Sequence, residues 1–181
     1  MTRCPRCLGA PRFCICDALA AVPAKVPVAL LQHALEAPKV SNTGRFVPLT
    51  LSNAQARVFG ARDTPLAADD LAAPGTVLLF PDDAAPPLAP RDVKRLVVVD
   101  ASWSQAKRMV QRVPALRRLP RLSLAVTAPQ KSLRDAPPGG LSTLQAVARA
   151  LAWLGDDEAA GALEQAHDAL LRRTVAARGY V

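Results

Sequence analysis

Short apolar runs alternate with segments of helical spacing along most of this chain. The runs at 26–31, 76–81 and 95–100 are rich in Val and Leu, which predicts strands buried on both faces. Two further segments, 57–60 and 122–126, predict additional strands. Each run closes with polar, aromatic or turn-forming residues, so the strand ends are the places to look for chemistry.

Four segments carry apolar residues at helical spacing instead. A turn at 42–44 starts the first, and the second follows Trp103 until Pro114 stops it. A Ser142–Gln145 capping box opens the third, and the fourth spans 157–177. The residues expected to face the core from the last two helices are Leu144, Val147, Ala148, Leu151, Leu163, Ala166, Leu170 and Val175. Strands that alternate with helices across short connections predict an α/β fold.

The size of the chain limits its organisation. At 181 residues, half of them hydrophobic, it suits one compact domain with a small appendage. We expect a knuckle at 1–24 and a main domain at 25–181. The start of the chain resembles no secretory signal, and no apolar stretch is long enough to span a bilayer. We therefore expect a cytoplasmic protein with no membrane contact and no obligatory protein partner.

The charge of +8 is unevenly distributed. Residues 1–62 hold eight Lys and Arg against two acids, and residues 93–134 hold ten against one, whereas 63–92 is acidic. Arginine dominates, and its planar fork binds phosphate through two hydrogen bonds. Two basic blocks of this kind favour a nucleic-acid partner, although a basic surface that only faces solvent is the alternative.

All four cysteines lie within the first 16 residues, in the pattern C-x2-C-x6-C-x-C: Cys4, Cys7, Cys14 and Cys16. Two close pairs of thiolates suit a tetrahedral zinc ion. A disulfide pair and an iron–sulfur cluster are the alternatives. Arg3, Arg6 and Arg12 surround this knuckle, so we expect it to touch phosphate as well.

Three predicted strands end in unusual residues: Gln32–His33, Phe80–Pro81 and Asp100–Trp103. In open α/β sheets, ligands bind at the carboxyl ends of the strands. Asp100 is the only acid between Lys94 and Arg134, which makes it a candidate base or substrate anchor. Alternatively, Asp100 or Ser102 caps the following helix, with Trp103 packed in the core. By the same strand-end rule, Phe80 and Pro81 are candidates for the wall of an adenine pocket.

Several segments together resemble one family. Residues 100–107 read Asp-Ala-Ser-Trp-Ser-Gln-Ala-Lys, and they follow the cysteine cluster and the Ser-Asn-Thr-Gly-Arg of 41–45. Leu-Ser-Thr at 141–143 comes last. In this order the motifs resemble the DTW-domain family of tRNA-uridine aminocarboxypropyltransferases, whose Asp-x-Thr-Trp pattern is changed here only by Ser102. Residues 33–36 resemble the family's His-Pro-x-Glu with an alanine for the proline, and 130–135 is less similar.

The resemblance implies a fold and a reaction. The fold is a SPOUT-like, mainly parallel sheet with flanking helices and a C-terminal knot, and it carries the small N-terminal zinc knuckle. The reaction transfers the 3-amino-3-carboxypropyl group of S-adenosylmethionine to N3 of a tRNA uridine and leaves methylthioadenosine. Asp100 then either accepts the N3 proton or holds the amino group of the donor, and the sequence leaves both roles open.

The remaining site residues follow from the same motifs and from charge. The expected catalytic residues are Asp100, Ser102 and Trp103. The expected cofactor-binding residues are Thr43, Phe80, Pro81, Leu141, Ser142 and Thr143. The expected RNA-binding residues are Arg3, Arg6, Arg12, Asn42, Arg45, Lys107, Arg108, Lys131 and Arg134. Two other functions stay open: a SPOUT-type RNA methyltransferase, and a non-catalytic zinc-containing RNA-binding module.

Overall fold

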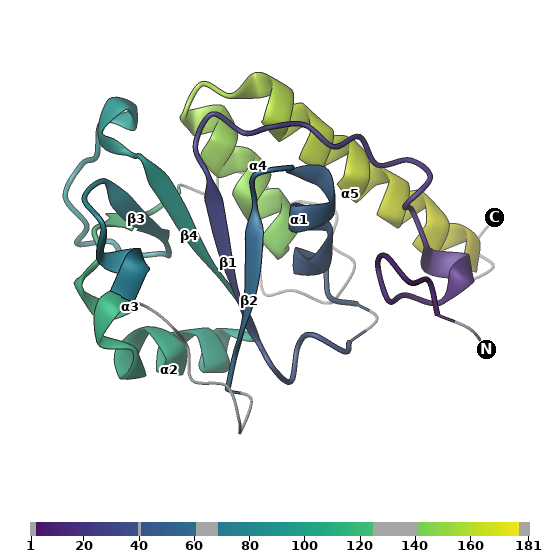
Figure 1. The fold of residues 1–181 in the computed structure, drawn as a ribbon, viewed down its shortest axis with the longest axis horizontal. Coiled ribbons are helices and arrows are strands. Elements are labelled where there is room, and N and C mark those ends of the chain that lie inside the picture. Colours follow the sequence, from purple (N-terminus) through teal and green to yellow (C-terminus); the bar gives the residue numbers. More distant parts are fainter. Residues whose placement is uncertain (1–2, 40, 61–68, 125–140, 178–181) are drawn as a thin grey trace.

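The computed structural model describes residues 3–39, 41–60, 69–124 and 141–177, and its centre is a five-stranded parallel sheet (Figure 1). The strands are β1 (Val28–His33), β2 (Gln55–Phe59), β3 (Thr76–Leu79), β4 (Arg95–Asp100) and β5 (Arg121–Leu122). Their order across the sheet is β2-β1-β4-β3-β5. The predicted α/β class with a mainly parallel sheet is therefore confirmed.

The register of the two central strands places their ends side by side. β1 and β4 are neighbours, and Gln32 lies opposite Asp100 at their carboxyl ends. After β1 the chain continues to β2 on one side, whereas β3 and β5 lie on the other side of β4. The boundary between β1 and β4 is thus a topological switch point, the position where open α/β sheets bind their ligands.

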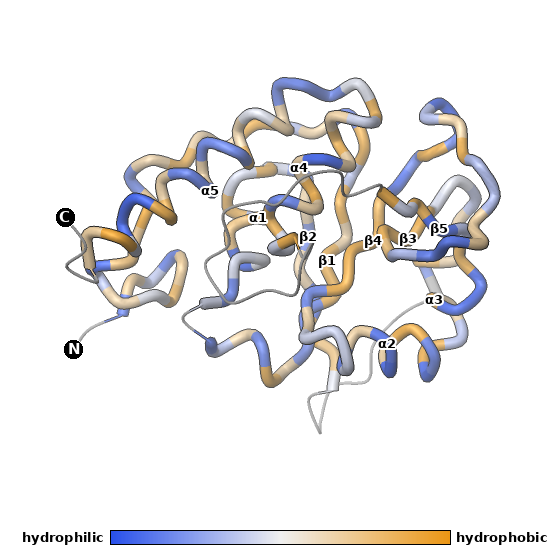
Figure 2. The backbone as a smooth tube through the Cα atoms, turned by 180° about the vertical axis from the view of Figure 1, so that it is seen from behind, coloured by the Kyte–Doolittle hydropathy of each residue, from blue (hydrophilic) through white to orange (hydrophobic). Residues whose placement is uncertain are grey.

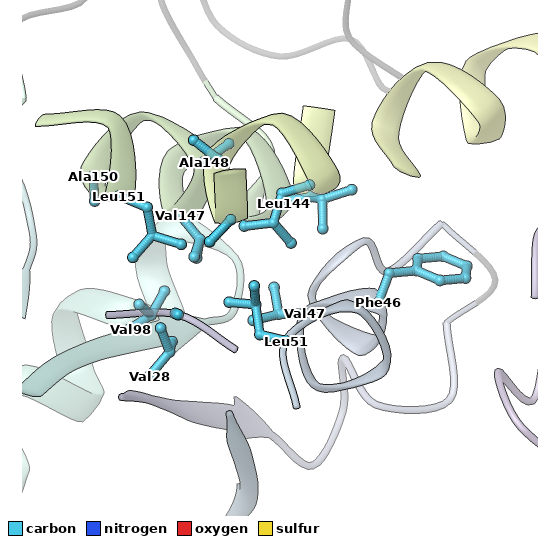
Figure 3. Packing of buried hydrophobic residues seen from close by; sticks show 14 of the residues in the cluster. Val28, Phe46, Val47, Leu51, Val98, Leu144, Val147, Ala148, Ala150 and Leu151 are labelled. Carbon is cyan, nitrogen blue, oxygen red and sulfur yellow. The ribbon is translucent and has the colours of Figure 1, made fainter. Parts of the chain in front are cut away.

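One face of the sheet is covered by α1 (Val47–Thr50), α4 (Thr143–Trp153) and α5 (Asp157–Ala177) (Figure 1). Figure 3 shows Leu144 and Val147 of α4 above the sheet residue Val98. The knuckle joins this cluster, because Cys7 and Ile15 are buried in it. These contacts place the start of α4 directly over the ends of β1 and β4.

The other face is covered by α2 (Trp103–Arg112) and α3 (Pro114–Arg118), where Met109 and Leu116 pack on Leu31 and Val97 of the sheet. Figure 2 shows hydrophilic and hydrophobic stretches alternating along these two helices, as their half-buried position requires. The short 3-10 turns are η1 (Pro11–Phe13), η2 (Gly44–Phe46), η3 (Asp69–Ala72) and η4 (Pro90–Asp92).

Several predicted bounds differ from the observed ones. The last helix has the predicted range and Pro114 ends α2, but the helix expected after 42–44 is only a 3-10 turn followed by α1. Pro48 lies in the first turn of α1, where proline is tolerated. The strand predicted at 122–126 is described only as Arg121–Leu122. The expected knot belongs to C-terminal loops that include 125–140, which lie outside the described residues.

The predicted core stripes are confirmed with one exception. Leu144, Val147, Leu163 and Leu170 are buried, whereas Val175 is 49% exposed, so the inward prediction for it is wrong. It lies in the last turn of α5. Within the described ranges, no helix has both the length and the apolar character that a bilayer crossing requires.

Candidate functional site

The carboxylate of Asp100 is the centre of a buried polar network. It ends β4, it is only 4% exposed, and both of its oxygens accept hydrogen bonds. Oδ2 accepts from Gln32 Nε2 at 2.7 Å and from Asn42 Nδ2 at 2.6 Å, and Oδ1 accepts from Thr143 Oγ1 at 2.7 Å. One carboxylate therefore connects β1, the 41–43 turn and the start of α4.

Gly44 makes this arrangement possible. A Cβ atom added there would lie 2.4 Å from Asp100 Cγ and 2.5 Å from its Oδ2, far inside van der Waals contact. Only glycine allows the backbone to approach the carboxylate so closely. The next residue, Arg45, donates its backbone N–H to Asn42 Oδ1 at 2.9 Å, which orients the Asn42 amide toward Asp100. The 42–45 motif is therefore the backbone cradle of the carboxylate.

Asp100 is not the cap of α2, which contradicts the structural alternative for it. Ser102 is the N-cap, and Gln105 completes the capping box by accepting from the Ser102 backbone N–H at 2.9 Å. The start of α2 is therefore capped without any hydrogen bond from Asp100. A buried carboxylate that serves no helix end and gathers three side-chain donors is a candidate for positioning a ligand.

Trp103 and Phe80 form an aromatic pair beside this carboxylate. Their ring centroids are 6.2 Å apart at an interplanar angle of 66°, an edge-to-face arrangement. Trp103 is 48% exposed, so the alternative that it packs in the core is wrong. The Arg121 guanidinium lies 5.7 Å from the centre of the Phe80 ring, and Pro81 is exposed next to it. The carboxyl ends of β3 and β4 therefore present an open aromatic surface.

The start of α4 contributes the third side of the site. Ser142 is its N-cap and accepts from Gln145 N at 3.3 Å, while Gln145 Oε1 accepts from Ser142 N at 3.1 Å. Thr143 follows and donates to Asp100, and Leu141 precedes them, half-buried. Thr43 is buried on the opposing turn. Backbone N–H groups in the first turn of a helix have no helical partner, so they suit an anionic group of a ligand.

The four cysteines converge as predicted: the Sγ atoms of Cys4, Cys7, Cys14 and Cys16 all lie within 4.8 Å of one another. The separations Cys4–Cys16 and Cys7–Cys14 are both 3.8 Å. Four thiolates held about 2.3 Å from one zinc ion would lie about 3.8 Å apart, so the spacing fits a tetrahedral metal. A disulfide needs sulfurs about 2 Å apart, and all four thiols are free.

Local backbone explains how the thiols converge. Leu8 adopts a φ of 56°, and its N–H donates to the Cys4 carbonyl at 2.8 Å, which closes a tight loop between the first two cysteines. N–H groups of this loop point at one sulfur, and their hydrogen bonds from Cys7 and Arg6 lower the pKa of Cys4 to about 6. Burial raises the pKa of Cys7 and that of Cys16. The loop thus favours one thiolate before any ion arrives.

Apart from Arg45, the predicted basic residues divide into three groups. Arg3, Arg6 and Arg12 are exposed around the knuckle, and Lys107 and Arg108 are exposed on α2. Lys131 and Arg134 lie outside the described residues.

Arg45 belongs to neither exposed set. Its guanidinium donates to the carbonyl oxygens of Cys7 at 2.9 Å and of Lys39, and burial lowers its pKa. It therefore joins the knuckle to the 42–45 cradle and is mostly occupied within the protein, so its predicted RNA contact would require it to leave these partners.

Gln32 also belongs to the site, although it is not among the site residues expected from the sequence. It is 8% exposed and bonds both Asp100 and Asn42, the latter at 3.3 Å to Oδ1. The signal was present, because Gln32 follows a purely apolar run. Its neighbour His33 is not near the thiols: its ring lies 6.2 Å from that of Phe59 and its Nδ1 accepts from Leu35 N at 3.1 Å.

Together these features define a parallel α/β protein with a candidate ligand site at its switch point and a four-thiol cluster that could hold a metal ion. A family model for the DTW domain matches residues 1–175, so the chain belongs to the DTW-domain family. It is also 31% identical, over 166 residues, to the tRNA-uridine aminocarboxypropyltransferase 2 of Drosophila melanogaster. That alignment covers 84% of this chain and 66% of the relative, so the chain spans about two thirds of its length. No solved structure matches the chain significantly.

Proposed function

We propose that this protein transfers the 3-amino-3-carboxypropyl group of S-adenosylmethionine to N3 of a uridine in tRNA. The observation that carries the proposal is the Asp100 network at the switch point, which brings together Asp100, Asn42 and Thr143 from three of the motifs that resemble the family. The name of the Drosophila relative supports the transfer of an aminocarboxypropyl group to a tRNA uridine. The open aromatic pair and the start of α4 supply the two surfaces that a nucleoside with an amino-acid chain requires.

The proposed reaction is a displacement at carbon. Uridine N3 attacks the methylene carbon next to the sulfonium, a carbon–nitrogen bond forms, and the carbon–sulfur bond breaks. The electron pair of that bond stays on sulfur, which leaves methylthioadenosine, and the N3 proton goes to a base or to water. Because the electrophile is already activated by its positive sulfur, the main task of the protein is in-line positioning.

Asp100 suits positioning better than proton transfer in this arrangement. Gln32 and Asn42 donate to Oδ2 and Thr143 donates to Oδ1, so three side chains fix the orientation of this carboxylate. A charged carboxylate at the start of α4 would hold the ammonium of the donor chain, while free N–H groups of that helix would take its carboxylate. Trp103 and Phe80 would stack on the nucleobase or the adenine.

The cysteine cluster would hold a structural zinc ion. The residues present fit it, because four thiols lie in two pairs with sulfurs 3.8 Å apart and four thiolates complete a tetrahedral structural zinc site. A zinc ion bound there would rigidify the knuckle of residues 1–24 against the catalytic part at 25–181. Arg45 would connect the ordered knuckle to the 42–45 cradle, since its guanidinium donates to the Cys7 carbonyl.

The test is the nucleoside content of tRNA. A strain lacking this gene, analysed by mass spectrometry, should lack aminocarboxypropyluridine, and the wild-type gene should restore it. A gene carrying Asp100→Asn should not restore it. Loss of a methylated uridine instead would favour the methyltransferase function, and an unchanged nucleoside profile would favour a non-catalytic RNA-binding module.

A further inference from the structure

The exposed face of α2 and α3 carries an unusual concentration of positive charge. All five basic residues of these two helices are exposed, and neither helix contains an acid. They are Lys107, Arg108, Arg112, Arg117 and Arg118. The three basic residues of α2 lie between positions 107 and 112, over a rise of about 7.5 Å along the helix axis.

Within the part of the chain that the structure describes, these charges have no acidic partner, whereas three other arginines do. Arg57 and Arg95 pair with Asp70, and Arg121 pairs with Asp82 at 3.0 Å. Among the described residues, no ion pair reaches any of the five, and Arg108 only donates to the Ser104 carbonyl at 3.2 Å. Like charges four residues apart, such as Arg108 and Arg112, destabilise a helix by about 0.2–0.5 kcal/mol. An unneutralised face of this kind suits an external polyanion.

The position of this face connects it to the site. α2 begins at Trp103, three residues after Asp100, with its exposed ring against Phe80. A nucleic-acid strand that lies along α2 would therefore reach the aromatic pair of Trp103 and Phe80 and then the buried carboxylate of Asp100. Figure 1 shows α2 and the cysteine-bearing segment on opposite flanks of the sheet. The basic residues of the cysteine-bearing segment and those of α2 therefore form two separate surfaces.

We propose that the α2–α3 face is the tRNA-docking surface, with its five basic residues on backbone phosphates and Trp103 at the end where the target nucleotide enters. This inference rests on the proposed function for its choice of RNA. A membrane surface fits less well, because the apolar side of α2, with Met109 and Val110, is already buried against the sheet. Basic helices that bind membranes need that side for insertion.

The test compares two double variants of equal charge. Arg117→Gln/Arg118→Gln removes two charges from the proposed surface, and Arg91→Gln/Arg172→Gln removes two exposed charges elsewhere. Dissociation constants for unmodified tRNA would be measured over a range of salt concentrations, with melting temperatures as a control for folding. The α3 variant should bind about tenfold or more weakly. Its log–log salt slope should fall by between one and two, as lost phosphate contacts require.

Three outcomes would overturn the inference. The α3 variant could bind tRNA like the control, the control could lose as much affinity, or only binding to phosphatidylserine vesicles could fall. Failure here is distinct from failure of the proposed function. If wild-type protein makes aminocarboxypropyluridine while the α3 variant binds and reacts normally, the docking surface is wrong and the reaction stands. If tRNA binding falls as expected but wild-type protein makes no product, the reaction is wrong and the surface stands.

Discussion

Two buried aspartates in this protein hold very different positions. Asp156 is 2% exposed and accepts from backbone N–H groups, Lys25 N at 2.6 Å and Ala159 N at 3.4 Å, so it caps α5 and ties it to the start of β1. Asp100 is 4% exposed and accepts from three side chains on three separate segments. The carboxylate of Asp156 therefore accepts hydrogen bonds from backbone groups, whereas that of Asp100, at the end of β4, accepts them from side chains.

The difference shows how to distinguish a structural carboxylate from a functional one when both are buried. Backbone donors exist wherever a helix begins, so an aspartate there needs no further explanation. Three side-chain donors from β1, a turn and α4 require a specific residue at each of three separate positions, and the close approach of the backbone requires Gly44 as a fourth. The protein also stabilises α2 with Ser102, although Asp100 is two residues away. Each prediction below would strengthen or break this distinction.

The largest effect is expected for Asp100→Asn. The asparagine carbonyl can accept from Gln32 and Asn42, and its amide can donate to the Thr143 hydroxyl after that hydroxyl rotates. The charge is lost but the shape and the hydrogen bonds are kept. Turnover should fall by about two to four orders of magnitude, the range typical of a missing charged group in a site. Melting temperature should change little.

Asp156→Asn is the matched control, because asparagine caps helices about as well as aspartate. It should keep turnover within about threefold of wild type, since its partners are backbone groups. Turnover and melting curves of both variants make the comparison. Equal turnover in the two variants would mean that Asp100 is a structural residue as well.

The next effect concerns two glycines. Gly44→Ala places a methyl group 2.4 Å from Asp100 Cγ, so the cradle must open and turnover should fall about a hundredfold, with a lower melting temperature. Gly161→Ala in α5 meets nothing within 4 Å and should stabilise the helix by roughly 0.5–1 kcal/mol. Denaturation curves and turnover of both variants check this. A fully active Gly44→Ala would contradict the tight cradle.

A smaller effect on turnover is expected from the metal. Wild-type protein should hold roughly one equivalent of zinc, and Cys4→Ser should lose it, because the site needs all four thiolates. The knuckle should loosen and activity should fall by about tenfold, through Arg45 rather than through the reaction itself. Asp17→Asn, outside the cluster, should keep the metal. Elemental analysis that finds no metal, or finds iron with sulfide, would rule out the zinc assignment.

The smallest effect is a pH dependence of stability in α5, the helix that Asp156 caps. Burial lowers the pKa of His167 from its ordinary value near 6.5, and the nearby Asp168 opposes this only in part. The folded state therefore favours neutral His167. Its stabilising contribution is full above pH 6.5 and is lost as the pH falls through the lower folded pKa. His167→Gln should flatten the stability curve in that range. An equally steep curve in the variant would assign the slope to other groups.

The sequence predicted the fold class well because its signals are local. The run 95–100 and the helix 157–177 keep their predicted bounds, since apolar periodicity and capping depend on neighbouring residues. The short α1 and the exposed Val175 were not predictable, because both depend on what the rest of the chain leaves uncovered.

The candidate site was predicted in its parts but not in its arrangement. Asp100, Asn42 and Thr143 were predicted separately, each from its own motif. Only the structure shows that Asn42, Thr143 and Gln32 all donate to the Asp100 carboxylate, and the register of β1 against β4 places Gln32 beside it. The convergence of the four cysteines was predicted from their spacing, whereas the left-handed Leu8 that closes the first loop was not. Whether Trp103 is buried or exposed depends on how α2 leaves the sheet, which no local pattern contains.

The most direct test of the central claim is the co-product formed from S-adenosylmethionine. Purified protein, unmodified tRNA and the donor would be incubated together, and small molecules and digested nucleosides would be quantified by mass spectrometry. The account predicts methylthioadenosine and aminocarboxypropyluridine in equal amounts, both abolished by Asp100→Asn. S-adenosylhomocysteine with a methylated uridine would contradict it.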